Sequence, residues 1–103
     1  MKLLVILCLE EHKKEVRKLL SNQKILMYSE VDVQGYKNET QDADIDNWFV
    51  NNKVQRFSKL FFFIQIEEKV NNMLQAVKNY NESHVGIKNY PIHAYKLNVE
   101  ETI

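Results

Sequence analysis

In each of two short runs of this chain, both the odd and the even positions are mostly apolar. The first covers about residues 2–9 and reads KLLVILCL, and the second covers about residues 57–66 and contains LFFFIQI. Runs of this length predict β-strands, and an apolar strand of this kind predicts cover on both sides of its sheet. The first run is too short to cross a membrane and acidic residues end it at once, so we interpret it as a strand rather than a targeting segment.

The rest of the chain alternates between helical and strand periods. Residues from about 11 to 21, and from 67 to beyond Tyr80, have the spacing of apolar side chains that is typical of amphipathic helices. Residues 25–34 alternate with a period of two, and Pro91 opens a last alternating run. The predicted order is β-α-β-β-α-β over one domain, residues 1–103. This order indicates a ferredoxin-like α+β sandwich, with a four-stranded antiparallel sheet and two helices on one face.

Two helices leave the second face of such a sheet uncovered. An exposed apolar face marks an interaction surface, and its burial stabilises an assembly by roughly 25 cal/mol per Å². We therefore expect copies of the chain to associate through their sheets.

Charge and cysteine content exclude several classes of protein. Fourteen basic residues balance fourteen acidic ones, which argues against a basic surface for nucleic acid or for anionic lipid. We expect no nucleic-acid partner and no insertion into a membrane. Cys8 is the one cysteine, so no internal disulfide can form, and a reducing cytoplasm is the expected location.

The order of elements and three local strings resemble the P-II (PII) family of signalling proteins. YSEVDVQGY at residues 28–36 resembles the family strand that ends in a Gly-aromatic pair and enters a long T-loop. EEKV at residues 67–70 is similar to the point where a strand passes into the second helix. PIHAYKLNVEETI at residues 91–103 resembles the last strand and its ending.

The resemblance implies a homotrimer with its sheets packed around a threefold axis and a T-loop at about residues 37–56. It implies a regulatory protein rather than an enzyme, of the kind that takes part in nitrogen regulation. A small ligand would bind between subunits, and the long loop would engage a partner protein such as a membrane transporter. The candidate ligand is an adenine nucleotide or a smaller anion, a carboxylate or bicarbonate, although the family's Gly-rich phosphate-binding stretch is incomplete here. The candidate ligand-binding residues are Gly35, Tyr36, Lys37, Arg56, Gly86 and Lys88.

The predicted loop holds the candidate partner-binding residues, which are Asp42, Asp44, Asp46, Trp48 and Phe49. The alternate aspartates begin like a calcium loop, but Asn47 and Lys53 stand where such a loop needs glycine and glutamate. A solvated acidic loop is the better interpretation, and loose binding of a divalent cation stays open. The aromatic pair predicts either packing on a neighbouring subunit or an anchor for a partner.

Three histidines support two further hypotheses. His12, His84 and His93 could form a metal site, as in a CutA-like divalent-metal-binding protein linked to metal tolerance, although none of them shows a close ligand spacing. Alternatively, His84 or His93 beside a large apolar cavity would indicate a small His-dependent enzyme on a dimeric α+β scaffold. The sequence contains no nucleophile elbow, P-loop or HExxH motif, so we assign no catalytic residue.

Overall fold

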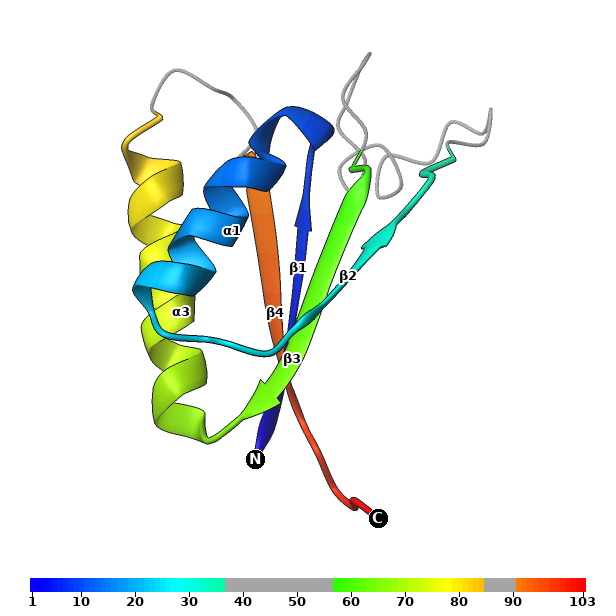
Figure 1. Ribbon diagram of the computed structural model, residues 1–103, viewed down its shortest axis with the longest axis vertical. Helices are drawn as coiled ribbons and strands as arrows, with labels where there is room; N and C mark the ends of the chain where they lie inside the picture. Colours follow the sequence, from blue (N-terminus) through cyan, green and yellow to red (C-terminus); the bar gives the residue numbers. More distant parts are fainter. Residues whose placement is uncertain (37–56, 85–90) are drawn as a thin grey trace, which may run out of the picture.

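The computed structural model describes residues 1–36, 57–84 and 91–103 (Figure 1). The strands are β1 (Lys2–Cys8), β2 (Ser29–Asp32), β3 (Lys59–Gln65) and β4 (Ile92–Asn98). The helices are α1 (Lys13–Asn22), which follows a 3-10 turn (Glu10–His12), and α3 (Glu67–Glu82). All strand pairs are antiparallel, in the order β2-β3-β1-β4, and both helices lie on one side of the sheet. The predicted ferredoxin-like fold is confirmed.

The core lies between the helices and one face of the sheet. Alternate residues of β1 and β3 face it, as the period of a strand requires. Val16 and Leu20 of α1 close it from one side and the apolar stripe of α3 closes it from the other. The buried members from the sheet and from α3 are Leu4, Ile6, Cys8, Phe61, Phe63, Ile92, Val70, Met73 and Val77. The helical spacing seen in the sequence therefore predicted the correct buried faces.

The opposite side of the sheet is equally apolar but has no helix over it. We call it the open face, and define it by the residues that pair across the strands there: Leu3, Val5, Leu7, Val31, Leu60, Phe62, Ile64, Tyr95 and Leu97. Phe62 is 38% exposed, Ile64 50% and Leu97 46%. Within the described part of the chain, the predicted uncovered apolar face is thus present.

The strand β2 is shorter than the predicted 25–34. Ile25 is buried in the core, and its N–H donates to the Leu20 carbonyl at 2.9 Å, so the chain here follows the end of α1 rather than the sheet edge. The turn that allows this places Lys24 at φ 61°, in the left-handed region that glycine usually occupies at helix ends. Regular pairing begins only at Ser29, which is opposite Phe62.

Candidate functional site

A pocket of about 390 Å³ lies where β2 and β3 leave the sheet toward residues 37–56. We call it the root pocket. Its lining residues are Val33, Gln34, Gly35, Tyr36, Phe57 and Ser58. Four of them follow β2 and two precede β3, so the antiparallel pairing of these strands brings the two short segments together. The sheet thereby supplies a rigid frame for a site that is built on irregular backbone.

Ser58 has a well-fixed backbone and an unpaired side chain. Its N–H donates to the Cys8 carbonyl at 3.0 Å, and its carbonyl accepts from the Val33 N–H at 2.8 Å. Its hydroxyl oxygen is buried, and within residues 1–36, 57–84 and 91–103 it has no hydrogen-bond partner. Because an unpaired buried hydroxyl is unfavourable, a polar ligand in the adjoining pocket would gain free energy by pairing with it.

The other polar side chains of the root pocket are more exposed. The Tyr36 hydroxyl donates to Gln34 Oε1 at 2.6 Å, which ties the two residues together across Gly35. On the second segment, the ring of Phe57 is buried and meets His93 of β4 edge-on, with the ring centres 4.9 Å apart. One wall is therefore held by the sheet, while the other presents polar groups to solvent.

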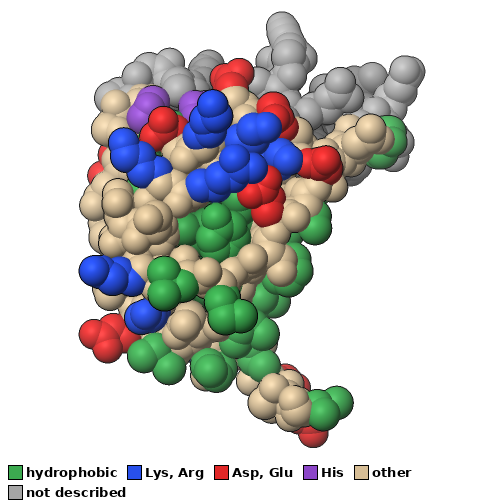
Figure 2. All heavy atoms as spheres, viewed as in Figure 1, with side chains coloured by type: hydrophobic (Ala, Val, Ile, Leu, Met, Phe, Trp, Pro, Cys, Tyr) green, Lys and Arg blue, Asp and Glu red, His purple; other side chains and the backbone are tan. Residues whose placement is uncertain are grey.

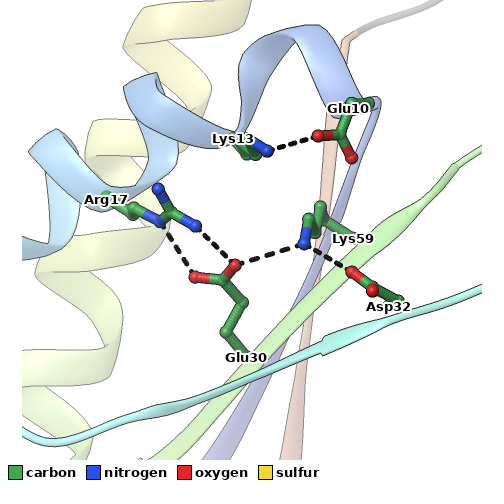
Figure 3. Close-up of polar contacts among 6 residues, drawn as sticks. All are labelled: Glu10, Lys13, Arg17, Glu30, Asp32 and Lys59. Carbon is green, nitrogen blue, oxygen red and sulfur yellow. Dashed lines mark hydrogen bonds and ion pairs between the residues drawn. The ribbon is translucent and has the colours of Figure 1, made fainter.

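A charged network on the helix side of the sheet fixes β2 in place (Figure 3). Arg17 of α1 donates to both carboxylate oxygens of Glu30, from Nε at 2.9 Å and from Nη2 at 2.6 Å. Lys59 lies 3.4 Å from Glu30 and also bonds Asp32. The hydrogen bond from Arg17 holds the pKa of Glu30 below its usual range, and the bond to Asp32 raises the pKa of Lys59. These contacts join α1, β2 and β3 just before the root pocket.

Cys8 lies at the end of β1, beneath this network. Its side chain is fully buried, and burial, with help from the Glu10 and Glu30 carboxylates, raises the pKa of its thiol to about 12. A thiol with so little thiolate is a poor nucleophile and a poor metal ligand. Cys8 therefore acts as a small apolar core residue.

The structure brings together two of the six predicted ligand-binding residues. Gly35 and Tyr36 both line the root pocket. The other four, Lys37, Arg56, Gly86 and Lys88, lie outside the described residues. The same is true of the whole predicted partner-binding set, Asp42, Asp44, Asp46, Trp48 and Phe49.

The three histidines separate into two groups. His12 and His84 lie close together, with ring centres 6.3 Å apart, between the start of α1 and the end of α3. His93 pairs with Leu7 on the opposite side of the sheet and packs against Phe57. Among the described residues, no three side chains of His, Cys, Asp or Glu are gathered as a metal site.

His93 also borders a groove of about 430 Å³ between α3 and β4. The groove is mainly apolar, with Leu74, Val77, Ile92 and Ala94 in its wall, and its polar lining is Lys78, Asn81 and Glu82. The Asn81 amide is occupied by the Ile92 backbone, donating to its carbonyl at 2.8 Å and accepting from its N–H at 3.3 Å. Burial lowers the pKa of His93, which favours the neutral form of its imidazole. The groove thus matches the apolar cavity beside His93 that the enzyme hypothesis named, while the amide of Asn81 in its wall is already occupied by the backbone.

Sequence reasoning did not identify Gln34, Phe57 or Ser58 as site residues. A serine that precedes a strand is common, and nothing in its neighbours shows that its hydroxyl lacks a partner. The one available signal was the position of Ser58 between a predicted loop and a predicted strand.

Comparisons with known proteins detect a relationship in structure only. No protein-family model matches the sequence, and no curated protein matches it. Among solved structures, a Thermus thermophilus protein described as PII-like and signalling is 18% identical, with a TM-score of 0.62 over 95% of this chain and 84% of that one. The chain has the fold of PII-like signalling proteins.

A second PII-like fold comes from Thiomonas intermedia. The apo form of its nitrogen regulatory protein CPII is 19% identical, with a TM-score of 0.60 over 95% of this chain and 89% of that one. The same protein bound to ADP, AMP and bicarbonate gives a TM-score of 0.53 at 18% identity, over 99% of this chain and 94% of that one. The resemblance noted in the three sequence strings thus agrees with the fold.

In the described ranges, no helix is long and apolar enough to span a membrane.

Proposed function

We propose that this chain is a PII-like regulatory protein that binds a small anionic ligand in the root pocket. The observation that carries the proposal is the buried Ser58 hydroxyl, which has no partner among the described residues and belongs to a residue that lines that pocket. Gly35 and Tyr36, which the resemblance had already implied as ligand contacts, line the same pocket. The proposed role is regulation, without a catalytic step.

The open face supports an assembly in which the root pocket lies near a seam between copies. Ser58 immediately precedes Lys59, whose side chain faces the helices, so the alternation of a strand puts Ser58 on the side of the open face. An assembly that buries the open face would bring a second copy close to the pocket. A homotrimer is the proposed assembly, in line with the packing that the resemblance implies.

Ligand chemistry is proposed from the related structure. CPII binds ADP, AMP and bicarbonate, and a hydroxyl with backbone amides can bind a phosphate or a carbonate oxygen. We propose ADP or AMP, together with bicarbonate, as the ligands to test first. Residues 37–56 would then engage a partner protein, for which a membrane transporter is the proposed class.

Ligand binding is tested by thermal unfolding of the full chain with ADP, AMP and bicarbonate, each alone and in pairs. A specific ligand raises the apparent stability according to its concentration relative to its Kd, about 2.7 kcal/mol at a hundredfold excess over Kd. The expected result is a concentration-dependent rise in Tm with at least one of these ligands. No rise with any of them up to millimolar concentration would refute the ligand proposal.

The assembly is tested separately by light scattering on a Phe62→Asp variant. Phe62 lies in the middle of the open face, between Val5 and Ser29 in the register, so a carboxylate there must be desolvated when copies meet. The expected result is a trimer for the unmodified chain and a smaller species for the variant. Leu26→Asp is the control, because Leu26 is 85% exposed and lies outside the open face. A monomeric unmodified chain would contradict the proposal.

A further inference from the structure

The two walls of the root pocket continue from a pair of residues that lie opposite each other in the sheet. Asp32 ends β2 and Lys59 begins β3, and the register places them directly across from one another. The lining of the pocket starts one position beyond each of them, at Val33 and Ser58. There the Val33 N–H donates to the Ser58 carbonyl at 2.8 Å. The contacts that hold Asp32 against Lys59 therefore also set how far apart the two walls stand.

Lys59 is joined to β2 through two carboxylates. Its ammonium bonds the Asp32 carboxylate and lies 3.4 Å from Glu30 Oε2 (Figure 3). Glu30 and Asp32 are two positions apart on one strand, so both side chains point to the same face of the sheet. The Lys59 side chain is 12% exposed, compared with 85% for Asp32. Figure 2 shows basic and acidic side chains gathered together on the upper part of this face. Lys59 is thus a largely buried cation that connects the start of β3 to the end of β2.

The Lys59 side chain acts from the side of the sheet that is opposite to Ser58. Lys59 is not among the residues that line the root pocket. Its side chain faces the helices, whereas Ser58 belongs to the side of the open face. A ligand that contacts Ser58 would therefore not touch the Lys59 ammonium. Any effect of Lys59 on the pocket has to pass through the backbone of the two strands.

Arg17 holds the same network from another direction. It donates to both oxygens of Glu30 and so anchors β2 to α1. These bonds do not reach β3, which carries the second wall of the pocket. The connection between the two walls therefore depends on Lys59 and not on Arg17.

We infer that Lys59 is a positioning residue whose bonds to Glu30 and Asp32 fix the separation of the two walls of the root pocket and thereby its affinity for ligand. The effect on affinity rests on the proposed function, whereas the effect on the walls does not. Opposite charges that face each other across two strands stabilise the pairing, each by a factor of up to about five. Loss of Lys59 removes two such contacts, so this end of the pairing should open about tenfold more often.

The test compares Lys59→Met with a matched control, Lys96→Met. Lys96 of β4 also makes an ion pair on the helix side of the sheet, with its ammonium 3.2 Å from Glu67 and 2.9 Å from Asn71. It lies opposite Leu4 in the register, away from the root pocket. Both substitutions replace an ammonium by an uncharged side chain of similar length, so they differ in which contacts they remove.

Amide hydrogen exchange of the full chain, followed by NMR, measures the opening of the walls without any ligand. The reporter is the Val33 N–H, because it bonds the Ser58 carbonyl across the two walls. We expect its exchange to be about tenfold faster in Lys59→Met than in the unmodified chain. It should be unchanged in Lys96→Met and restored in Lys59→Arg, which keeps the charge.

Asp32→Ala tests the same contacts in a variant that keeps the buried part of the network. The Asp32 side chain is 85% exposed, so its removal leaves no cavity. Because one of the two contacts across the strands is lost, exchange at Val33 should be up to about fivefold faster. This variant decides the question if Lys59→Met does not fold.

Calorimetric titration with ADP and bicarbonate then connects the walls with binding. Affinity falls with the fraction of chains that keep the walls in the binding arrangement, so Lys59→Met should bind up to about tenfold more weakly, while Lys96→Met and Lys59→Arg should bind as the unmodified chain does. If the unmodified chain binds neither compound, the proposed ligands are refuted, and exchange at Val33 still decides the role of Lys59. Unchanged exchange at Val33 in Lys59→Met or Asp32→Ala, an equal increase in Lys96→Met, or a Lys59→Met chain that binds as tightly as the unmodified one would each overturn the inference.

Discussion

Replacement of Ser58 by alanine should change stability and ligand affinity in opposite directions. The Ser58 hydroxyl is buried and has no partner in the described part of the chain, and a buried polar group in that condition costs about 1–3 kcal/mol. Ser58→Ala therefore removes this oxygen and none of the hydrogen bonds between described residues. The two backbone hydrogen bonds of residue 58, to Cys8 and from Val33, do not involve the side chain.

The expected gain in the free energy of unfolding is about 1 kcal/mol, the lower end of the range, because the residue lies beside a pocket rather than deep in the core. For a domain of this size, 1 kcal/mol corresponds to a rise in Tm of about 4–8 °C. If the hydroxyl contacts a charged ligand, its loss should weaken binding by about 1.5–3 kcal/mol, which is a factor of about ten to more than a hundred.

The assay is thermal unfolding without ligand, followed by titration with ADP and bicarbonate. Ser21→Ala is the control, since Ser21 is exposed on α1, far along the chain from the root pocket, and its removal should leave ligand affinity unchanged. A lower Tm for Ser58→Ala without ligand would refute the reasoning, because it would show that the hydroxyl has a stabilising partner.

Three further predictions test the helix end, the charged network and the buried thiol. Lys24→Gly should raise the free energy of unfolding by about 1 kcal/mol in urea denaturation, because a non-glycine residue at φ 61° carries strain; an unchanged midpoint would contradict this. Arg17→Gln should destabilise the chain at pH 7. The pKa of Glu30 is lower in the folded chain than its ordinary value of 4.5. The Glu30 carboxylate therefore adds to the free energy of unfolding above pH 4.5, and this stabilisation is lost as the pH falls through the lower pKa of the folded chain. The difference between Arg17→Gln and the unmodified chain in urea denaturation should therefore disappear in acid, and a constant difference across pH would argue against the Glu30 contact. Cys8, with its pKa raised to about 12, should react slowly with a thiol reagent at pH 8 in the folded chain and quickly in guanidinium; rapid labelling of the folded chain would show that the thiol is accessible.

The histidine hypothesis shows where sequence spacing fails. His12 and His84 are 72 positions apart, and no local motif connects them. They meet because α1 begins and α3 ends at the same end of the sheet, which only the packing of antiparallel helices decides. The metal hypothesis grouped His93 with these two histidines. The register of β4 against β1 pairs His93 with Leu7, which places it on the side of the open face.

The strand β2 shows a similar limit. A period of two over residues 25–34 predicted a ten-residue strand, but Ile25 reaches the core from the helix side. The alternation correctly placed Val31 in a strand, but Ile25 is not part of that strand. The two cannot be told apart in the sequence, because burial against a helix end and burial against a sheet select the same apolar residue types.

The sequence alone determined the order of the elements, the buried stripe of each helix and the apolar character of the open face. These follow from local period and composition, since side chains three or four apart share a helix face and alternate side chains share a strand face. Tertiary structure decided which separated side chains meet: the segments around Gly35 and Ser58 in one pocket, Arg17 with Glu30, and His12 with His84. The physical reason is that strand register and helix packing depend on contacts between distant parts of the chain, and those contacts leave no period in the sequence.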